Sequence, residues 1–227
     1  MTWGIIGAMD DEVALLRDAM KERRESKVYD STFYHGGLEG QDVVLVCCGI
    51  GKVNAALCAA VLLREFAVDR IVHVGIAGAM DPALQVLDVV LSKDVGYHDQ
   101  GAVYDEHYPF RRVFDADPGL IELAEKACRE DGEIRYYIGR VATGDEFITS
   151  AGEKQKILSK MRPLCVEMEG AAVAQAAYMS GVPFLVIRAM SDSADDDAAM
   201  TYYEFKERAC RQSAGIVRRM LRLAPRG

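Results

Sequence analysis

Carboxylates dominate the side chains of this sequence that could do chemistry, and they gather at the ends of apolar segments. Residues 10–12 are three consecutive acids that follow an apolar run and a glycine. Two glutamates flank a methionine in 166–170, and an arginine, a serine and an aspartate share 188–192. Paired carboxyl groups suit acid and base catalysis of hydrolysis at an acetal-like carbon, as in glycoside cleavage.

The same acids also have structural explanations, which the sequence alone leaves open. Acids at 10–12 would stabilise the N-terminus of a helix that begins there. Glu167 and Glu169 would serve equally well as a solvated capping pair at a strand-to-helix junction. Arg188 lies in an apolar strand and needs a buried anion beside it, for which one of these two glutamates is the obvious partner.

Cofactor and metal chemistry find little support in the sequence. The glycine turn at 7–12 lacks the dinucleotide-binding pattern, and its carboxylates would repel a pyrophosphate. The segment 49–52 resembles part of a phosphate-binding loop but fails its spacing, and Val53 replaces the hydroxyl residue. The histidines show no zinc-ligand spacing, and His73 reads as a core residue. We therefore expect neither a metal nor a cofactor.

Composition and charge narrow the class of protein. The chain has 227 residues, of which 50% are hydrophobic and 27% charged, with a net charge of −8. That charge disfavours nucleic acid or an anionic membrane as the main partner. Six cysteines without C-x-x-C pairs indicate free thiols in a reducing compartment. The apolar run at 55–63 is far shorter than the roughly 20 residues of a membrane span, and we expect a cytoplasmic protein.

Strand-like and helix-like segments alternate along the chain, which predicts one α/β domain over 1–227. We expect a three-layer sandwich with a central, mixed, twisted sheet flanked by helices. Expected strands are 3–7, 33–38, 42–48, 71–75, 86–94, 137–143, 164–167 and 184–190, and expected helices are 12–24, 52–66, 118–130, 151–160, 169–180 and 202–223. The polar, aromatic segment 96–114 is expected to be a functional loop. Because ligands of such sheets bind outside the carboxyl ends of the strands, the acids above should share one edge.

Seven short motifs together resemble a known family along nearly the whole chain. They are Ile5-Ile6-Gly7-Ala8-Met9 with Glu12, Gly49-Ile50-Gly51-Lys52-Val53, Tyr97-His98-Asp99, Thr143-Gly144-Asp145-Glu146-Phe147-Ile148, Val166-Glu167-Met168-Glu169-Gly170, Arg188-Ala189-Met190-Ser191-Asp192 and Tyr202-Tyr203-Glu204-Phe205. Their order and spacing are similar to those of the 5′-methylthioadenosine/S-adenosylhomocysteine nucleosidases, in the purine nucleoside phosphorylase superfamily.

The resemblance implies a reaction and three catalytic residues. The reaction would be hydrolysis of the N-glycosidic bond, which releases adenine and a 5-thio-substituted ribose in methionine salvage and removal of methyl-cycle by-products. Glu12 would deprotonate the attacking water, and Asp192 would protonate N7 of the departing adenine. Glu169 would accept hydrogen bonds from the ribose hydroxyls and stabilise an oxocarbenium-like transition state. Asp192 must then keep its proton near neutral pH, which requires a raised pKa.

Substrate-binding residues and a partner are implied in the same way. The binding residues would be Met9, Ile50, Ile76, Ala77, Gly78, Phe147, Ile148, Glu167, Met168, Arg188, Ser191 and Tyr202. Phe147 would stack on adenine, and Arg188 would orient the buried acids. A homodimer is implied, with a loop near Tyr108 and Pro109 completing the site of the partner.

One departure from the family pattern leaves the substrate open. Ile76 stands where many members have serine or threonine, so a hydroxyl that could touch the ribose or the water is missing. Aminodeoxyfutalosine hydrolysis would use the same chemistry and stays an alternative. A phosphate-dependent nucleoside phosphorylase is a second alternative, and it would need a pocket of arginines. A non-catalytic nucleoside-binding protein is a third, although the three acids are all present.

Overall fold

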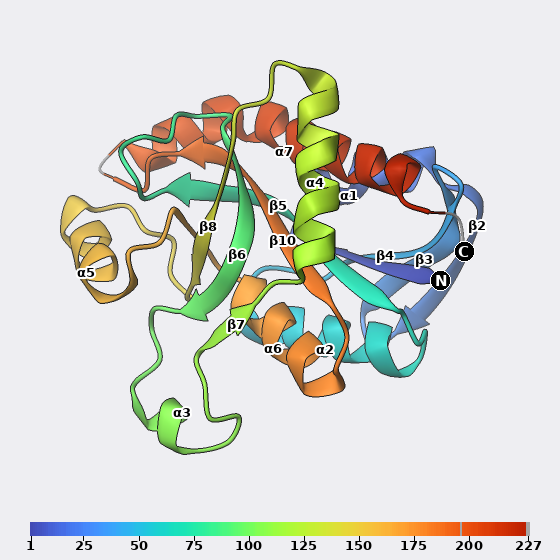
Figure 1. Ribbon diagram of the computed structural model, residues 1–227, viewed down its shortest axis with the longest axis horizontal. Helices are drawn as coiled ribbons and strands as arrows, with labels where there is room; N and C mark the ends of the chain where they lie inside the picture. The colour runs from blue at the N-terminus through green and yellow to red at the C-terminus, as the bar shows by residue number, and fades with distance from the viewer. Residues whose placement is uncertain (196, 226–227) are drawn as a thin grey trace.

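The apolar segments predicted as strands form one ten-stranded sheet (Figure 1). The structure is a computed structural model and describes residues 1–195 and 197–225. Its centre consists of β1 (Thr2–Gly7), β5 (Arg70–Ala79) and β10 (Phe184–Asp192), which are almost wholly buried. They run parallel to one another, and β4 (Gln41–Cys47) is parallel to β1. Continuous apolar runs suit such strands, because helices cover both faces of the sheet.

Five strands of the sheet pair in a ring, so the sheet is not simply open. β5 pairs with both β10 and β9 (Cys165–Glu167), while β6 (Val89–Tyr97) and β8 (Tyr136–Thr143) link β10 to β9. The short β7 (Val113–Asp115) pairs with β6. On the other side, β1 and β4 continue the sheet into an antiparallel edge.

That edge consists of β3 (Ser31–Leu38), which confirms the strand predicted over 33–38, and β2 (Lys21–Val28), for which the prediction was wrong. We expected a helix over 12–24, but α1 (Asp10–Ala19) ends at Ala19 and Lys21 begins a strand. The apolar positions of the helix stop at Met20, and the charged residues beyond it carry no alternation. The exposed strand β2 is defined by its pairing with β3, which a hydrophobic pattern cannot reveal.

Helices cover both faces of the sheet and complete the three-layer α/β sandwich (Figure 1). The further helices are α2 (Lys52–Arg64), α3 (Val103–Glu106), α4 (Pro118–Asp131), α5 (Ala151–Met161), α6 (Gly170–Ser180) and α7 (Ala198–Leu223). α1 and α4 pack against α7 on one face, and α2 packs against α6 on the other. α7 begins four residues earlier than predicted. No helix among the described residues is long and apolar enough to cross a membrane.

The pairing of β9 brings chemistry-bearing segments to one edge. β9 contacts only the last residues of β5, with Val166 opposite Gly78 and Cys165 opposite Ala79. Glu167 at the end of β9 therefore lies over the carboxyl end of β5. The carboxyl ends of β1, β4 and β10 meet at this same place because those strands are parallel to β5 or to its neighbour.

Candidate active site

One cavity of about 460 Å³ lies at these strand ends. It is lined by all the sequence-predicted site residues except Ile148 and Arg188, namely Met9, Glu12, Ile50, Ile76, Ala77, Gly78, Phe147, Glu167, Met168, Glu169, Ser191, Asp192 and Tyr202. Ile148 lines a small adjoining space together with Phe147 and Asp192. Arg188 is buried behind the wall of the cavity.

The cavity is also lined by four residues that were not predicted from the sequence. For three of them the sequence motifs contained a signal. Ala8, Val166 and Tyr203 stand inside the recognised motifs, next to residues that were selected. Ala199 lies in the first turn of α7, where we had not yet expected a helix. Its omission follows directly from the misplaced start of α7.

Glu12 is held by the backbone around it and is only 3% exposed. Its Oε2 accepts hydrogen bonds from the N–H groups of Ala8, at 2.7 Å, and Met9, at 2.9 Å. Its Oε1 accepts from the N–H of Ile76 at 3.0 Å. Burial raises the pKa of Glu12, against the lowering effect of Arg188 and of the three N–H groups. Glu12 thus caps α1 and also lines the cavity, so the structural and the chemical explanations hold together.

Asp192 is 1% exposed at the end of β10. Its Oδ2 accepts a hydrogen bond from the hydroxyl of Ser191 at 2.7 Å, and its Oδ1 accepts from the N–H of Ala194 at 2.9 Å. Gly78 is required for this approach, since a Cβ there would lie 2.7 Å from Asp192 Oδ1. Burial raises the pKa of Asp192, and these two hydrogen bonds lower it less. The carboxyl group is therefore set to hold a proton that an ordinary aspartate would lose.

Glu167 and Glu169 do not form a solvated capping pair, because they are 6% and 5% exposed. Glu169 precedes α6, and its Oε1 accepts a hydrogen bond from the N–H of Gly51 at 2.8 Å. The glycine turn before α2 thus directs an N–H at a carboxyl group. Burial raises the pKa of Glu169, and the neighbouring charge of Glu167 raises it further.

Glu167 has its carboxylate oxygens already occupied. Its Oε2 receives Nη2 of Arg188 at 2.5 Å and the N–H groups of Glu169 and Gly170 at 3.1 and 2.7 Å, while the hydroxyl of Thr143 donates to Oε1. Burial by itself raises its pKa, but the charge and hydrogen bond of Arg188, together with His73 and the hydroxyl of Thr143, leave the pKa lowered. The sequence expectation that Arg188 has a buried anionic partner is confirmed, and the partner is Glu167.

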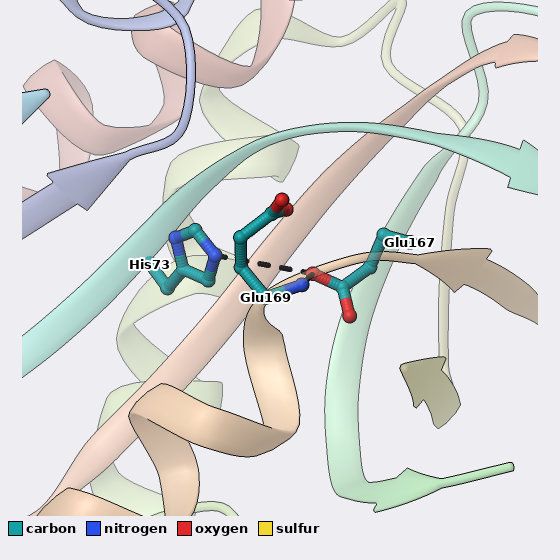
Figure 2. A group of neighbouring side chains, drawn as sticks. All are labelled: His73, Glu167 and Glu169. Atoms are coloured by element: carbon teal, nitrogen blue, oxygen red, sulfur yellow. Dashed lines mark hydrogen bonds and ion pairs between the residues drawn. The ribbon is translucent and has the colours of Figure 1, made fainter. Parts of the chain in front are cut away.

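Figure 2 shows His73, Glu167 and Glu169 converging from β5, β9 and the start of α6. One potential ligand atom from each lies within 4.8 Å of the others, so the three could in principle hold a cation. The guanidinium of Arg188 already fills that role, at 2.5 Å from Glu167 Oε2 and 2.6 Å from Nε2 of His73. The cluster therefore fits an internal ion network and not a metal centre.

The rest of the cavity is apolar and aromatic. The rings of Phe147 and Tyr202 meet edge to face with centroids 5.5 Å apart. The hydroxyl of Tyr202 donates to Sδ of Met9 at 3.3 Å, and this hydrogen bond connects α7 with the segment after β1. Ile76 presents a hydrocarbon side chain beside Glu12. Flat rings and aliphatic walls of this kind suit a heteroaromatic base and an apolar substituent.

Tyr108 and Pro109 do not line the cavity of their own chain. They lie in the loop of α3, which projects from the body of the molecule (Figure 1). Tyr108 and Phe110 are exposed and their rings contact each other edge to face. The loop also holds α3 and leads into β7, so it is more ordered than the irregular segment that we expected over 96–114.

Comparison with known proteins gives a consistent result. Residues 2–222 match the sequence model of the phosphorylase superfamily. A 5′-methylthioadenosine/S-adenosylhomocysteine nucleosidase of Geobacillus sp. (strain WCH70) is 38% identical over 96% of each chain. The crystal structure of the corresponding Neisseria meningitidis nucleosidase, in complex with methylthio-immucillin-A, has a TM-score of 0.94 at 34% identity, over 98% of this chain and 99% of that one.

A more distant structural relative carries a different name. The native structure of futalosine hydrolase of Helicobacter pylori strain 26695 has a TM-score of 0.90 at 28% identity, over 97% of each chain. The Geobacillus and Neisseria relatives, which have higher identity, carry the same name, and each similarity covers at least 96% of this chain. The chain therefore belongs to the phosphorylase superfamily and, within it, to the family of the 5′-methylthioadenosine/S-adenosylhomocysteine nucleosidases.

Proposed function

We propose that this protein hydrolyses the N-glycosidic bond of 5′-methylthioadenosine and S-adenosylhomocysteine and releases adenine. The observation that carries this proposal is the cavity itself. It brings Glu12, Glu169 and Asp192 to one space, and each has a raised pKa. Aromatic and aliphatic side chains form the remaining walls. Carboxyl groups that can donate or accept protons, next to aromatic and aliphatic walls, suit cleavage of the bond between a nucleobase and a sugar.

Glu12 is the proposed general base for the attacking water. The three backbone N–H groups fix the direction of its carboxylate, so the group is aligned before a substrate enters. Burial raises its pKa and makes the carboxylate a stronger base than an exposed glutamate. A base whose pKa lies nearer the working pH takes up the proton of water more effectively.

Asp192 is the proposed acid that protonates N7 of the departing adenine. Adenine leaves poorly as an anion and well as a neutral molecule, so the proton lowers the barrier of bond cleavage. Burial raises the pKa of Asp192, so its carboxyl group keeps the proton to a higher pH than an exposed aspartate does. The hydroxyl of Ser191 and the N–H of Ala194 hold the carboxyl group in one orientation.

Glu169 is the proposed partner of the ribose hydroxyls. It faces the cavity from the start of α6 and is fixed by Gly51. Met168 would pack under the sugar, and Phe147 would stack on the base. Met9, Ile50 and Tyr202 would contact the 5′ substituent, and Ile76 replaces a hydroxyl with hydrocarbon beside the water-activating carboxylate.

A phosphate-dependent reaction is disfavoured by the charges of the cavity. Among the described residues, no lysine or arginine lines it, while Glu12, Glu167, Glu169 and Asp192 do. The nearest guanidinium, that of Arg188, is buried and engaged by Glu167. A phosphate dianion entering beside these acids would meet repulsion with no cation to offset it.

The test is adenine release from 5′-methylthioadenosine and S-adenosylhomocysteine, each with and without phosphate, with aminodeoxyfutalosine as a third substrate. We expect release from the first two at equal rates in both conditions, with a free sugar as the second product. Release only with phosphate, giving a sugar 1-phosphate, would contradict hydrolysis. If aminodeoxyfutalosine is hydrolysed faster than the other two, it is the substrate of this protein, and the proposed chemistry stays the same.

We further propose that the protein works as a homodimer in which the α3 loop of one subunit completes the site of the other. Ile50, Val53 and Leu57 at the start of α2 are exposed, although they are large and apolar. Exposed apolar side chains also occur on α6, at Tyr178 and Met179, and in the α3 loop. Ile50 both lines the cavity and is 54% exposed, so a partner covering this face would also close the mouth of the site.

Sedimentation of the full chain tests the dimer. Leu57→Glu places a charge in the middle of the proposed apolar face and should give a monomer that binds substrate weakly. Leu15→Glu, on an exposed position of α1, is the matched control and should leave the dimer intact. A protein that is monomeric and fully active would contradict this proposal.

A cytoplasmic setting completes the proposal, and the cysteines support it. All six are free thiols, five of them buried. Burial raises the pKa of Cys48, Cys128, Cys165 and Cys210, so these thiols are poor nucleophiles. Cysteines that remain free thiols are typical of a reducing compartment.

A further inference from the structure

We propose that His73 is a positioning residue for this reaction: as a neutral hydrogen-bond acceptor it fixes Arg188 between Glu167 and Glu12. The inference rests on the proposed hydrolysis, in which Glu12 acts as the base. His73 lies in the middle of β5, is fully buried and does not touch the cavity. The apolar sequence around His73 indicates a core residue, but both nitrogens of its ring make polar contacts in the structure.

The hydrogen bonds of the ring define its protonation. Nδ1 lies 3.0 Å from the carbonyl oxygen of Ile6 on the neighbouring strand β1. A carbonyl can only accept, so Nδ1 carries the proton and Nε2 carries the lone pair. Nη2 of Arg188 donates to that lone pair at 2.6 Å. Burial lowers the pKa of His73 to about 3, and the charge of Arg188 acts in the same direction, so the ring stays neutral.

The acceptor on His73 determines where the guanidinium lies. Nη2 of Arg188 is shared between His73 and Glu167. These two residues come from β5 and β9, and their side chains face each other (Figure 2). Nη1 is then turned toward Gly75, where a Cβ would be 2.8 Å from it and 2.3 Å from Oε1 of Glu12. The absent side chain of Gly75 therefore leaves one space that Arg188 and Glu12 both enter. Without His73, one of the two contacts that hold Nη2 is lost.

Arg188 is the cation that faces Glu12. The other titratable groups around Glu12 are Glu169 before α6, Tyr202 and Cys210 on α7, and Cys47 and Cys48 at the end of β4. Burial raises the pKa of every one of them, and the charge of Glu12 raises it further. Arg188 and the three backbone N–H groups stabilise the carboxylate form of Glu12, and of these Arg188 is the one that His73 contacts.

The experiment compares the pH dependence of adenine release in three variants. His73→Leu removes the acceptor, and His73→Gln keeps an amide that can donate to Ile6 and accept from Arg188. Val72→Ala is the control, since it removes apolar volume from the adjacent buried position of β5. For each, kcat and KM for 5′-methylthioadenosine are measured between pH 5 and 9, together with Tm.

We expect His73→Leu to lower kcat by about 10- to 100-fold, with little change in KM. The loss of a residue that hydrogen-bonds to a metal ligand has an effect of this size at metal sites. The acid limb of its kcat/KM profile should move to higher pH, because a loosened Arg188 stabilises the Glu12 carboxylate less. His73→Gln should recover most of kcat and the original limb. Val72→Ala should lower Tm and leave the limb in place.

Three outcomes would overturn the proposal. His73→Leu could keep the pH profile of the unaltered protein, or His73→Gln could behave as His73→Leu does, or Val72→Ala could shift the limb equally. If His73→Leu does not fold, His73→Asn replaces it, because its amide is too short to reach both Ile6 and Arg188 and should give the same shift. Absence of adenine release from the unaltered protein refutes the proposed function and this inference together, whereas normal release with an unshifted limb refutes the inference alone.

Discussion

Charged side chains gather in two regions of this molecule, and the two regions hold them in opposite ways. At the carboxyl ends of the central strands, Arg188 and Glu167 pair at 2.5 Å in a fully buried position. At the antiparallel edge, the strand β2 is exposed along almost its whole length. There Arg23 lies 3.7 Å from Glu25, and the exposed Lys27 lies 3.6 Å from Asp30.

Burial, and not residue type, separates these two regions. Removing a charge from water costs several kcal/mol, which the buried site offsets with close ion pairs and backbone N–H donors. The exposed edge keeps its charges hydrated, so each ion pair contributes little. Charge on β2 instead discourages other chains from pairing with an open sheet edge. The comparison predicts that equivalent substitutions will have effects that differ by orders of magnitude.

The largest effect is expected from Glu12→Gln. The amide keeps the size of the side chain but cannot accept the proton of water, so kcat for adenine release should fall by about 10²- to 10⁴-fold. The matched control is Glu25→Gln on β2, which should keep full activity. Both proteins are compared by steady-state kinetics at neutral pH and by circular dichroism. Near-normal turnover by Glu12→Gln would show that another group activates the water.

Arg188→Met is expected to have the next largest effect, on stability as well as on activity. It leaves Glu167 buried without its cation, at a cost of about 3–5 kcal/mol in the free energy of unfolding. Arg23→Met, at the exposed edge, should change that free energy by less than about 0.5 kcal/mol. Urea unfolding of the three proteins measures the difference.

The double variant Arg188→Met with Glu167→Leu sharpens the comparison. Replacing a whole buried ion pair with apolar residues is often neutral or stabilising. Glu167 also accepts from the N–H groups of Glu169 and Gly170, which would lose their partner, so stability should return in part while activity does not. A double variant as unstable as Arg188→Met alone would mean that packing, and not an unpaired charge, causes the loss.

Asp192→Asn is expected to inactivate the enzyme and yet to stabilise it at high pH. The folded pKa of Asp192 lies above the unfolded value of about 3.9. Stability from this group is thus fully present below the unfolded pKa and is lost as pH rises through the folded pKa. Asparagine carries no such penalty, so its Tm advantage should be near zero at pH 4 and grow toward pH 8, by about 2–4 °C for each kcal/mol gained.

Thermal melts across this pH range provide the measurement, with Asp30→Asn as the control. Asp30 is fully exposed in the turn after β2, so Asp30→Asn makes the same chemical change at a carboxyl group that is not buried. A constant Tm difference for Asp192→Asn across the range would contradict a raised pKa in the folded protein.

The two regions also differ in how well the sequence predicted them. The segments around the cavity are short local motifs at strand ends, and the parallel register of β1, β5 and β10 brings them together as expected. The partnership of His73 with Arg188 depends on which strands are neighbours, and no local pattern encodes it. The predicted helix over 12–24 ran into the first four residues of β2, and no strand was predicted over 21–28, because the side chains of this strand are exposed and show no hydrophobic alternation. The early start of α7, and Ala199 with it, was missed, although Asp197 occupies the N-cap position of this helix and aspartate is a preferred N-cap residue.

The smallest effect is expected from Lys27→Ala, which removes the exposed ion pair with Asp30. Water screens both charges before and after the substitution, and the long lysine side chain regains conformational freedom, so the free energy of unfolding should change by about 0.5 kcal/mol or less. Urea unfolding at low and at high salt measures this change. A loss above about 1 kcal/mol that disappears in high salt would mean that the charges of β2 act as a network and stabilise the edge. Burial would then not be the only property that distinguishes this edge from the active site.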